Sequence, residues 1–381
     1  MKIAILGGGI SGLSAAWSLV HQHPRSQIVL FEKSSRLGGC IETVDLFEKG
    51  PRTFRSSHCP SLLRLIEDLG LKDELLFSQS ASSKRYLWHQ GSLRSIFKLS
   101  APYLLRMLFA LFIPKGTQEE TVYSFFRRRY GVGIADLFAD PLCLGIYAGD
   151  CRTLSVNACF PSLKGIEKKR GRGSLFTLQR GMQSLIDALQ QQLAIDIRLN
   201  SEVHSLKQLH QKWEINNLFV ADHVVSALPF PVLARLFPSL IPLHHVSMIV
   251  ANIGFSSFEF PHRGYGYLVP TRENQSLLGM IWDSAIFPQQ AGTRLTAMMR
   301  AGTAFPEETI LHALRSHLGI SQQPDRIDIH HPETAIPQFT LGHAQRLQSW
   351  ENALPGVALL GNYTDGVSVE KCISRSFKLK I

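Results

Sequence analysis

KIAILGGGISG, at positions 2–12, is a short apolar run that leads directly into a glycine-rich turn. An apolar pattern with helical spacing begins at Leu13, so the stretch predicts a strand, a tight turn and a helix. Gly7, Gly9 and Gly12 form the pattern G-x-G-x-x-G. The first glycine permits the bend, the second lets backbone approach a pyrophosphate, and the third lets the helix pack on the strand. The helix start then offers free N–H groups to a phosphate.

A second apolar strand follows at Ile28–Phe31 and ends in Glu32, which lies 20 residues after Gly12. A carboxylate at this position accepts hydrogen bonds from ribose hydroxyls. It disfavours a 2′-phosphate, so NADP is not expected. The pattern predicts a dinucleotide site, and a βαβ unit without a ligand is the alternative.

Composition narrows the class of protein. The chain has 381 residues, of which 45% are hydrophobic and 18% charged, which excludes disorder, collagen and coiled coil and suggests about two domains. A formal charge of +10 suits an anionic partner: nucleic acid, an anionic membrane or a small polyanionic substrate. The six cysteines show no C-x-x-C pair and no zinc spacing, so we expect free thiols in a reducing, cytoplasmic compartment and no metal.

Two stretches after Glu32 carry a family resemblance. Arg36, Gly38 and Gly39 complete E-x-x-x-R-x-G-G, which resembles the FAD-binding start of the flavin amine oxidase and protoporphyrinogen oxidase superfamily. The stretch 50–54 reads G-P-R-T-F and is similar to protoporphyrinogen oxidases in particular.

Later stretches resemble the same family in matching order and extend the resemblance over nearly the whole chain. They are 120–129, 147–150, 155–163, 264–270, 336–343 and 361–369. Amine oxidases usually carry an E-G-A type ending where this chain reads G-V-S-V at 366–369.

The resemblance implies FAD as cofactor. The positions it implies as FAD contacts are Gly7, Gly8, Gly9, Ile10, Ser11, Gly12, Glu32, Lys33, Arg36, Gly38, Gly39, Gly50, Pro51, Arg52, Thr53, Val203, Asn362, Val367, Ser368 and Val369. For Val203, which we place in an alternating strand at 200–206, core packing is the alternative. Arg52 could instead brace the flavin turn. Ser374–Ser376 replace the glycine that usually opens a longer final helix, which puts the packing of that helix in question.

The implied activity is the six-electron oxidation of protoporphyrinogen IX to protoporphyrin IX in haem biosynthesis, with oxygen as acceptor. Arg85 would hold a propionate, with a solvated surface arginine as the alternative; Tyr265, Leu268 and Met298 would contact the ring. No general base or other catalytic residue is assigned. Oxidation of coproporphyrinogen III, with four propionates, is the first alternative function, and a flavin amine oxidase is the second. A nucleic-acid partner is not expected.

The expected fold is α/β with mixed α+β parts, namely a Rossmann-like FAD domain with inserted substrate and helical segments. The FAD domain would be discontinuous, from 1–75, 176–230 and 345–381, and the substrate domain would span 76–91 and 231–344. Residues 92–175 would form a helical insertion.

The insertion combines an apolar stretch at 103–112 with a basic cluster at 168–172. This combination suggests peripheral attachment to an anionic bilayer, on the inner face of the cell membrane. An internal helix wall that lines an apolar cavity, beside a solvated basic loop, is the alternative. Monomer and homodimer both stay open.

Overall fold

The computed structural model describes residues 1–167, 171, 173–332 and 335–381. The chain divides into two compact units. The first unit comprises Met1–Leu76, Leu175–Leu243 and Ala344–Ile381, and the second comprises Phe77–Ser174 and His244–His343. The helical segment expected at 92–175 therefore lies almost entirely in the second unit.

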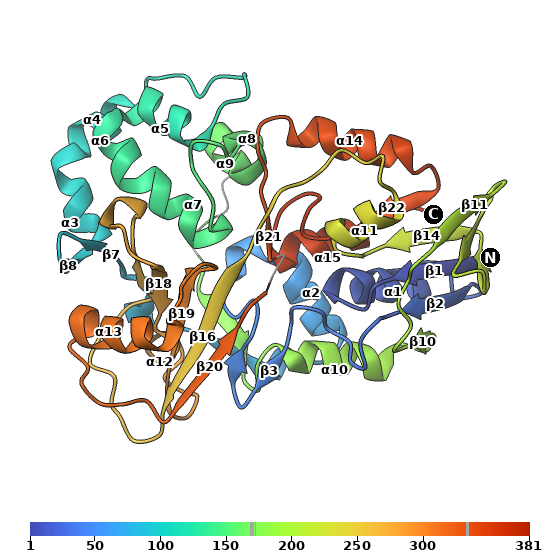
Figure 1. Cartoon of the computed structure of the whole chain (residues 1–381), viewed down its shortest axis with the longest axis horizontal. Coiled ribbons are helices and arrows are strands. Elements are labelled where there is room, and N and C mark those ends of the chain that lie inside the picture. Colours follow the sequence, from blue (N-terminus) through green and yellow to red (C-terminus); the bar gives the residue numbers. More distant parts are fainter. Residues whose placement is uncertain (168–170, 172, 333–334) are drawn as a thin grey trace. The chain divides into compact units, whose positions relative to one another are not determined.

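A five-stranded parallel sheet forms the centre of the first unit (Figure 1). Its strand order is β10 (Asp196–Arg198), β2 (Gln27–Phe31), β1 (Lys2–Leu6), β14 (His223–Ser226) and β22 (Val357–Leu359). Burial on both faces explains why the strands read as continuous apolar runs, as is usual for parallel sheets.

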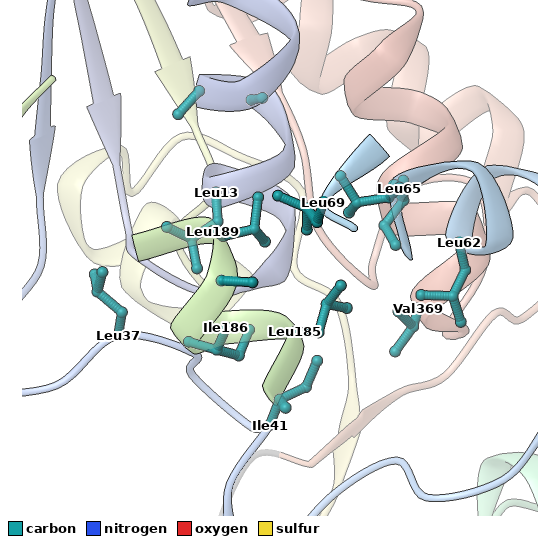
Figure 2. Packing of buried hydrophobic residues seen from close by; sticks show 14 of the residues in the cluster. Leu13, Leu37, Ile41, Leu62, Leu65, Leu69, Leu185, Ile186, Leu189 and Val369 are labelled. Carbon is teal, nitrogen blue, oxygen red and sulfur yellow. The ribbon is translucent and has the colours of Figure 1, made fainter. Parts of the chain in front are cut away.

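Each face of this sheet carries its own apolar cluster, because successive side chains of a strand point to opposite faces. Ile3 and Ile5 pack with the helices α1 (Ile10–Gln22), α2 (Pro60–Asp68), α10 (Gln183–Gln192) and α15 (Val369–Phe377). Figure 2 shows this packing around Leu13, Leu185 and Val369. Ala4 and Leu6 pack in the other cluster, which includes α11 (Phe230–Leu236), α14 (His343–Ala353) and the strands β12 (Lys212–Ile215) and β13 (Phe219–Ala221).

The prediction of a strand at 200–206 is wrong. Residues 201–205 have no regular secondary structure, and β11 begins only at Leu206 and ends at Leu209. The Asn216 carboxamide explains the difference, because its Oδ1 accepts hydrogen bonds from the backbone N–H groups of His204 and Ser205 at 3.0 and 3.1 Å. Those N–H groups bond to a side chain instead of a neighbouring strand.

The second unit contains a seven-stranded mixed sheet. Its order is β20 (Arg326–His330), β16 (Met248–Phe255), β19 (Thr293–Arg300), β18 (Leu277–Ile281), β17 (Gly266–Leu268), β7 (Arg85–His89) and β8 (Ser92–Ser95). One face of this sheet packs on α13 (Pro306–Leu318) through a cluster that includes Tyr267, Ala297 and Leu314. The two units together confirm the expected mixed α/β class.

The α-helices within 92–174 are all short. They are α3 (Ile96–Ser100), α4 (Leu104–Phe109), α5 (Val122–Tyr130), α6 (Val132–Ile134), α7 (Asp140–Tyr147), α8 (Val156–Cys159) and α9 (Pro161–Lys164). Thr121 and Ser155 cap α5 and α8 by accepting hydrogen bonds from backbone N–H groups. Within the described residues, no helix has the length and apolar character needed to cross a membrane.

Candidate active site

The glycine-rich turn lies between β1 and α1. Gly7 adopts φ +100°, and a Cβ added to it would lie 2.9 Å from the Ala227 carbonyl oxygen. A Cβ on Gly12 would lie only 2.0 Å from the Gly7 carbonyl oxygen. The protein's own backbone therefore explains the glycines at positions 7 and 12.

Gly9 is different, because nothing in its own surroundings demands a glycine. Its backbone is extended, at φ −74° and ψ 177°, and an added Cβ would meet only Gly39 Cα, at 3.9 Å. In the described part of the chain, no side chain caps α1 and no acid lies in its first turn. The room above Gly9 and the open N–H groups of the helix start fit a pyrophosphate.

Glu32 ends β2 beside this turn and is buried. Its Oε2 accepts a hydrogen bond from the Gly8 N–H at 2.7 Å, and its Oε1 accepts one from the Ser34 N–H at 2.8 Å. Each carboxylate oxygen can accept a second hydrogen bond, so Glu32 retains capacity for a ribose hydroxyl. Lys33 next to it is exposed.

Arg36 shapes the second loop of the site. Its guanidinium donates to the carbonyl oxygens of Leu37, Gly39 and Ile41 at 3.0, 2.7 and 3.2 Å, and pairs with Glu42 at 2.8 Å. The loop also meets the first turn, since the Gly38 N–H donates to the Gly8 carbonyl at 2.9 Å. The bonds of Arg36 indicate that it positions the loop.

The stretch 50–53 packs against the same loop. A Cβ on Gly50 would lie 2.0 Å from the Cys40 carbonyl oxygen, so Gly50 allows the close approach. Arg52 donates to the Glu48 carbonyl at 3.0 Å, which supports a bracing role next to Pro51. The Thr53 hydroxyl is buried and has no hydrogen-bond partner among the described residues. A buried polar atom of this kind fits a hydrogen bond to a bound cofactor.

The C-terminal segment completes the first unit. Ser368 caps α15 by accepting a hydrogen bond from the Lys371 N–H, which places Val367, Ser368 and Val369 at the start of that helix. Despite its short length, α15 packs against α1, and the Ser376 hydroxyl donates to the Ser11 carbonyl at 2.9 Å. The doubt about the packing of this helix is thereby removed. Asn362 precedes it in the loop after β22.

Val203 is buried, with 5% of its surface exposed, among the apolar residues around β1 and β12. This position agrees with core packing, and a contact of Val203 with the cofactor stays a prediction.

Strand register brings the expected substrate residues of the second unit together. Arg85 pairs with Gly266, and Leu268 pairs with Gly279, which in turn pairs with Met298. Paired residues of neighbouring strands share a face, as do alternate residues of one strand. Arg85, Leu268 and Met298 therefore lie on the sheet face opposite α13, and Leu268 and Met298 are only half-buried.

Tyr265 precedes β17 and holds Arg85 from the side. The Arg85 guanidinium carbon lies 4.4 Å from the centroid of the Tyr265 ring, in a cation–π contact. Gly266 allows β17 to approach β18 closely, since a Cβ there would lie 2.1 Å from the Met280 carbonyl oxygen. The four expected substrate residues thus combine one cation, Arg85, with the apolar side chains of Leu268 and Met298, which together we call the apolar floor.

Tyr267 anchors the same strand on the opposite face. Its hydroxyl lies 2.9 Å from Nδ1 of His317, which projects from α13 and is only 7% exposed. Burial, with a smaller contribution from His312, lowers the pKa of His317 from 6.5 to about 4. The folded protein therefore holds this imidazole neutral at neutral pH.

We expect acid to weaken this anchor. Below pH 6.5 the unfolded chain binds a proton at His317 before the folded protein does, so the stabilisation present above pH 6.5 is lost as the pH falls towards 4. The loss should total about 3 kcal/mol, at about 1.4 kcal/mol per pH unit. Urea unfolding at several pH values checks this. His317→Gln should flatten the dependence, and equal dependences would contradict the assignment.

Three further stretches of the family resemblance meet within the second unit. The Gln338 carboxamide donates to the Tyr147 carbonyl at 2.9 Å, and the Ser155 N–H donates to the Phe339 carbonyl at 2.8 Å. The stretches 147–150, 155–163 and 336–343 therefore support one another, which accounts for their joint presence. The basic cluster at 168–172 lies outside the described residues except for Gly171.

The family model for flavin-containing amine oxidoreductases matches residues 10–376. The chain belongs to this family. It is an FAD-dependent oxidoreductase, which confirms the expected cofactor, and the turn at 7–12, Glu32 and the buried Thr53 hydroxyl fit that cofactor. Among the described residues, no group of three or more His, Cys, Asp or Glu side chains could hold a metal ion.

Several relatives of this flavoprotein are named enzymes. The chain is 31% identical to human protoporphyrinogen oxidase, over 97% of this chain and 96% of the relative. It is 27% identical to coproporphyrinogen III oxidase of Bacillus subtilis, over 98% and 96%. A crystal structure of a proposed protoporphyrinogen oxidase from Exiguobacterium sp. 255-15 superposes with a TM-score of 0.85 at 24% identity, covering 99% and 97% of the two chains.

The roles of three residues of the flavoprotein could not be predicted from local sequence patterns. Ser376 ties α15 to α1, and the Glu370 carboxylate accepts from the N–H groups of Ser61 and Leu62 at the start of α2. His317 anchors β17. Each acts through a contact between segments distant in the sequence, which leaves no local sequence signal.

Proposed function

We propose that this flavoprotein oxidises protoporphyrinogen IX to protoporphyrin IX in haem biosynthesis, with oxygen as acceptor. The observation that carries the proposal is the cation–π pair of Arg85 and Tyr265 on the sheet face that also carries the apolar side chains of Leu268 and Met298. When bound, FAD supplies the two-electron oxidation. The protein's own residues bind and orient the substrate: the guanidinium holds a propionate through a charge-assisted hydrogen bond, and the floor contacts the macrocycle.

The relatives support this proposal over amine oxidation. The human, bovine and fission yeast relatives at 30–31% identity are all protoporphyrinogen oxidases. An amine substrate is a cation at neutral pH, and the Arg85 cation held by Tyr265 would repel it.

Coproporphyrinogen III is the second candidate substrate. Its four propionates suit the formal charge of +10, and the Bacillus subtilis relative is a coproporphyrinogen III oxidase. Initial rates with both porphyrinogens, followed side by side by porphyrin fluorescence, separate the two. We expect the higher kcat/KM with protoporphyrinogen IX, and a strong preference for coproporphyrinogen III would overturn this choice.

We also propose peripheral contact with an anionic membrane, on the inner face of the cell membrane, through 97–112. Eight large apolar side chains of this surface are exposed: Phe97, Leu104, Leu105, Met107, Leu108, Phe109, Leu111 and Phe112. Their exposure favours a surface role over an internal cavity wall. Lys98 and Arg106 lie among them and Lys115 follows, and 97–115 contains no acid, so the charge suits anionic lipids.

Hydrogen bonds from α5 hold the apolar surface in place. Buried Arg129 of α5 donates to the carbonyl oxygens of Ala110 and Ile113, directly after α4. These bonds indicate a preformed surface.

We expect Leu105→Glu with Phe109→Glu to lower binding to vesicles containing anionic lipid by at least about tenfold, since the two side chains are 73% and 64% exposed and lose apolar burial in the bilayer. Leu218→Glu, at an 84% exposed leucine of the first unit, is the matched control. Sedimentation with vesicles measures this, and equal binding of both variants would contradict the membrane proposal.

A further inference from the structure

The hairpin formed by β7 and β8 carries a second arginine near Arg85. The two strands are antiparallel, with Leu87 opposite Arg94 and a two-residue turn at Gln90 and Gly91. Opposite residues share a face, and Arg85 shares that face as an alternate residue of β7. Arg85 and Arg94 are therefore diagonal neighbours, a relation that places two residues about 7–8 Å apart, with their Cβ atoms somewhat closer.

Both arginines lie at one end of an apolar row. Leu87 pairs with Leu268, Leu268 with Gly279, and Gly279 with Met298. Gly279 carries no side chain, and the Leu268 side chain lies over it, with Cδ2 3.0 Å from the position of an added Cβ. The face thus places two neighbouring cations at one margin of an apolar row, in which Leu87 is fully buried and Leu268 lies next to Gly145 of α7.

Arg94 is available for a ligand. Its side chain is exposed, and its Nε donates to the Ser92 hydroxyl at 3.2 Å. No salt bridge of Arg94 occurs within the described part of the chain. By contrast, Arg128, Arg180 and Arg375 pair with carboxylates at 2.8 Å or less. Those arginines have carboxylate partners, which Arg94 lacks among the described residues.

We propose that Arg94 binds a second carboxylate of the porphyrinogen, next to the one held by Arg85. This inference rests on the proposed function and deepens it. Two forked donors side by side suit two carboxylates on neighbouring pyrrole rings, which is where protoporphyrinogen IX carries its two propionates. Arg94 is then a specificity residue that selects porphyrinogens with two adjacent acidic side chains.

Steady-state kinetics of the FAD-loaded enzyme test this. We expect Arg94→Ala to raise KM for protoporphyrinogen IX about threefold to tenfold and to change kcat less than twofold. The effect should be smaller than that of Arg85→Ala, because an exposed charge pair is weaker. Arg94→Lys should restore part of the affinity. With the dimethyl ester of the substrate, Arg94→Ala and the unmodified enzyme should have the same KM.

Arg315→Ala, at an exposed arginine of α13 on the other side of the sheet, is the matched control and should leave KM unchanged. If Arg94→Ala has an unchanged KM, or raises KM equally for the acid and the ester, the inference is wrong while the proposed function stands. If the unmodified enzyme oxidises no porphyrinogen, the proposed function itself fails.

Discussion

Gly9→Ala is expected to fold normally and to bind FAD about 10- to 100-fold more weakly. The added Cβ would lie 3.9 Å from the nearest atom, Gly39 Cα, and the backbone conformation is open to alanine, so the protein itself tolerates the change. In the complex the methyl group would occupy the space of the pyrophosphate, and overpacking of this kind costs about 1–3 kcal/mol. Flavin released on denaturation, together with the thermal midpoint of the flavin-free protein, measures both effects.

Two other glycines serve as controls for this result. Gly302→Ala should leave FAD binding and stability unchanged, since no atom lies within 4 Å of its added Cβ. Gly12→Ala should lower stability as well, because its Cβ would lie 2.0 Å from the Gly7 carbonyl oxygen. If Gly9→Ala binds FAD as tightly as the unmodified protein, Gly9 does not lie against the pyrophosphate and the turn is an ordinary βαβ connection.

Arg85→Ala is expected to raise KM for protoporphyrinogen IX by about 10- to 150-fold. This corresponds to about 1.5–3 kcal/mol, the usual contribution of a hydrogen bond to a charged group. The Tyr265 ring holds the guanidinium in place at 4.4 Å, so Arg85→Lys should recover the charge but not the stacked, forked geometry, with an intermediate KM. Initial rates over a range of porphyrinogen concentrations measure this.

Flavin content is the control for Arg85→Ala, because Arg85 lies in the second unit and the FAD turn in the first. The variant should retain bound FAD. An unchanged KM would refute the propionate role of Arg85.

The nucleotide turn was predictable because strand, turn and helix follow one another within a dozen residues and leave a short pattern in the sequence. The requirement at Gly12 is local, since it comes from the Gly7 carbonyl, whereas the requirement at Gly7 comes from the distant Ala227 carbonyl. Val203 shows the limit of local reasoning. Its alternating pattern predicted a strand, but the side chain of Asn216, thirteen residues later, binds the backbone N–H groups next to it.

The grouping of the candidate substrate residues on one sheet face could not be predicted from the sequence. Arg85 and Tyr265 are 180 residues apart, and only the pairing of β7 with β17 brings them into contact. The position of Arg94 opposite Leu87 depends on a local feature. Gln90 and Gly91, both with positive φ, form a two-residue hairpin turn that fixes this pairing. The relation of Arg94 to Leu268 and Met298 still depends on long-range pairing.

Anaerobic mixing of the FAD-loaded protein with protoporphyrinogen IX tests the porphyrinogen oxidase assignment most directly. We predict that the visible absorbance of oxidised flavin disappears at a rate that rises with porphyrinogen concentration, and that it returns on admission of oxygen as porphyrin fluorescence develops. A flavin spectrum that neither protoporphyrinogen IX nor coproporphyrinogen III changes would contradict the assignment.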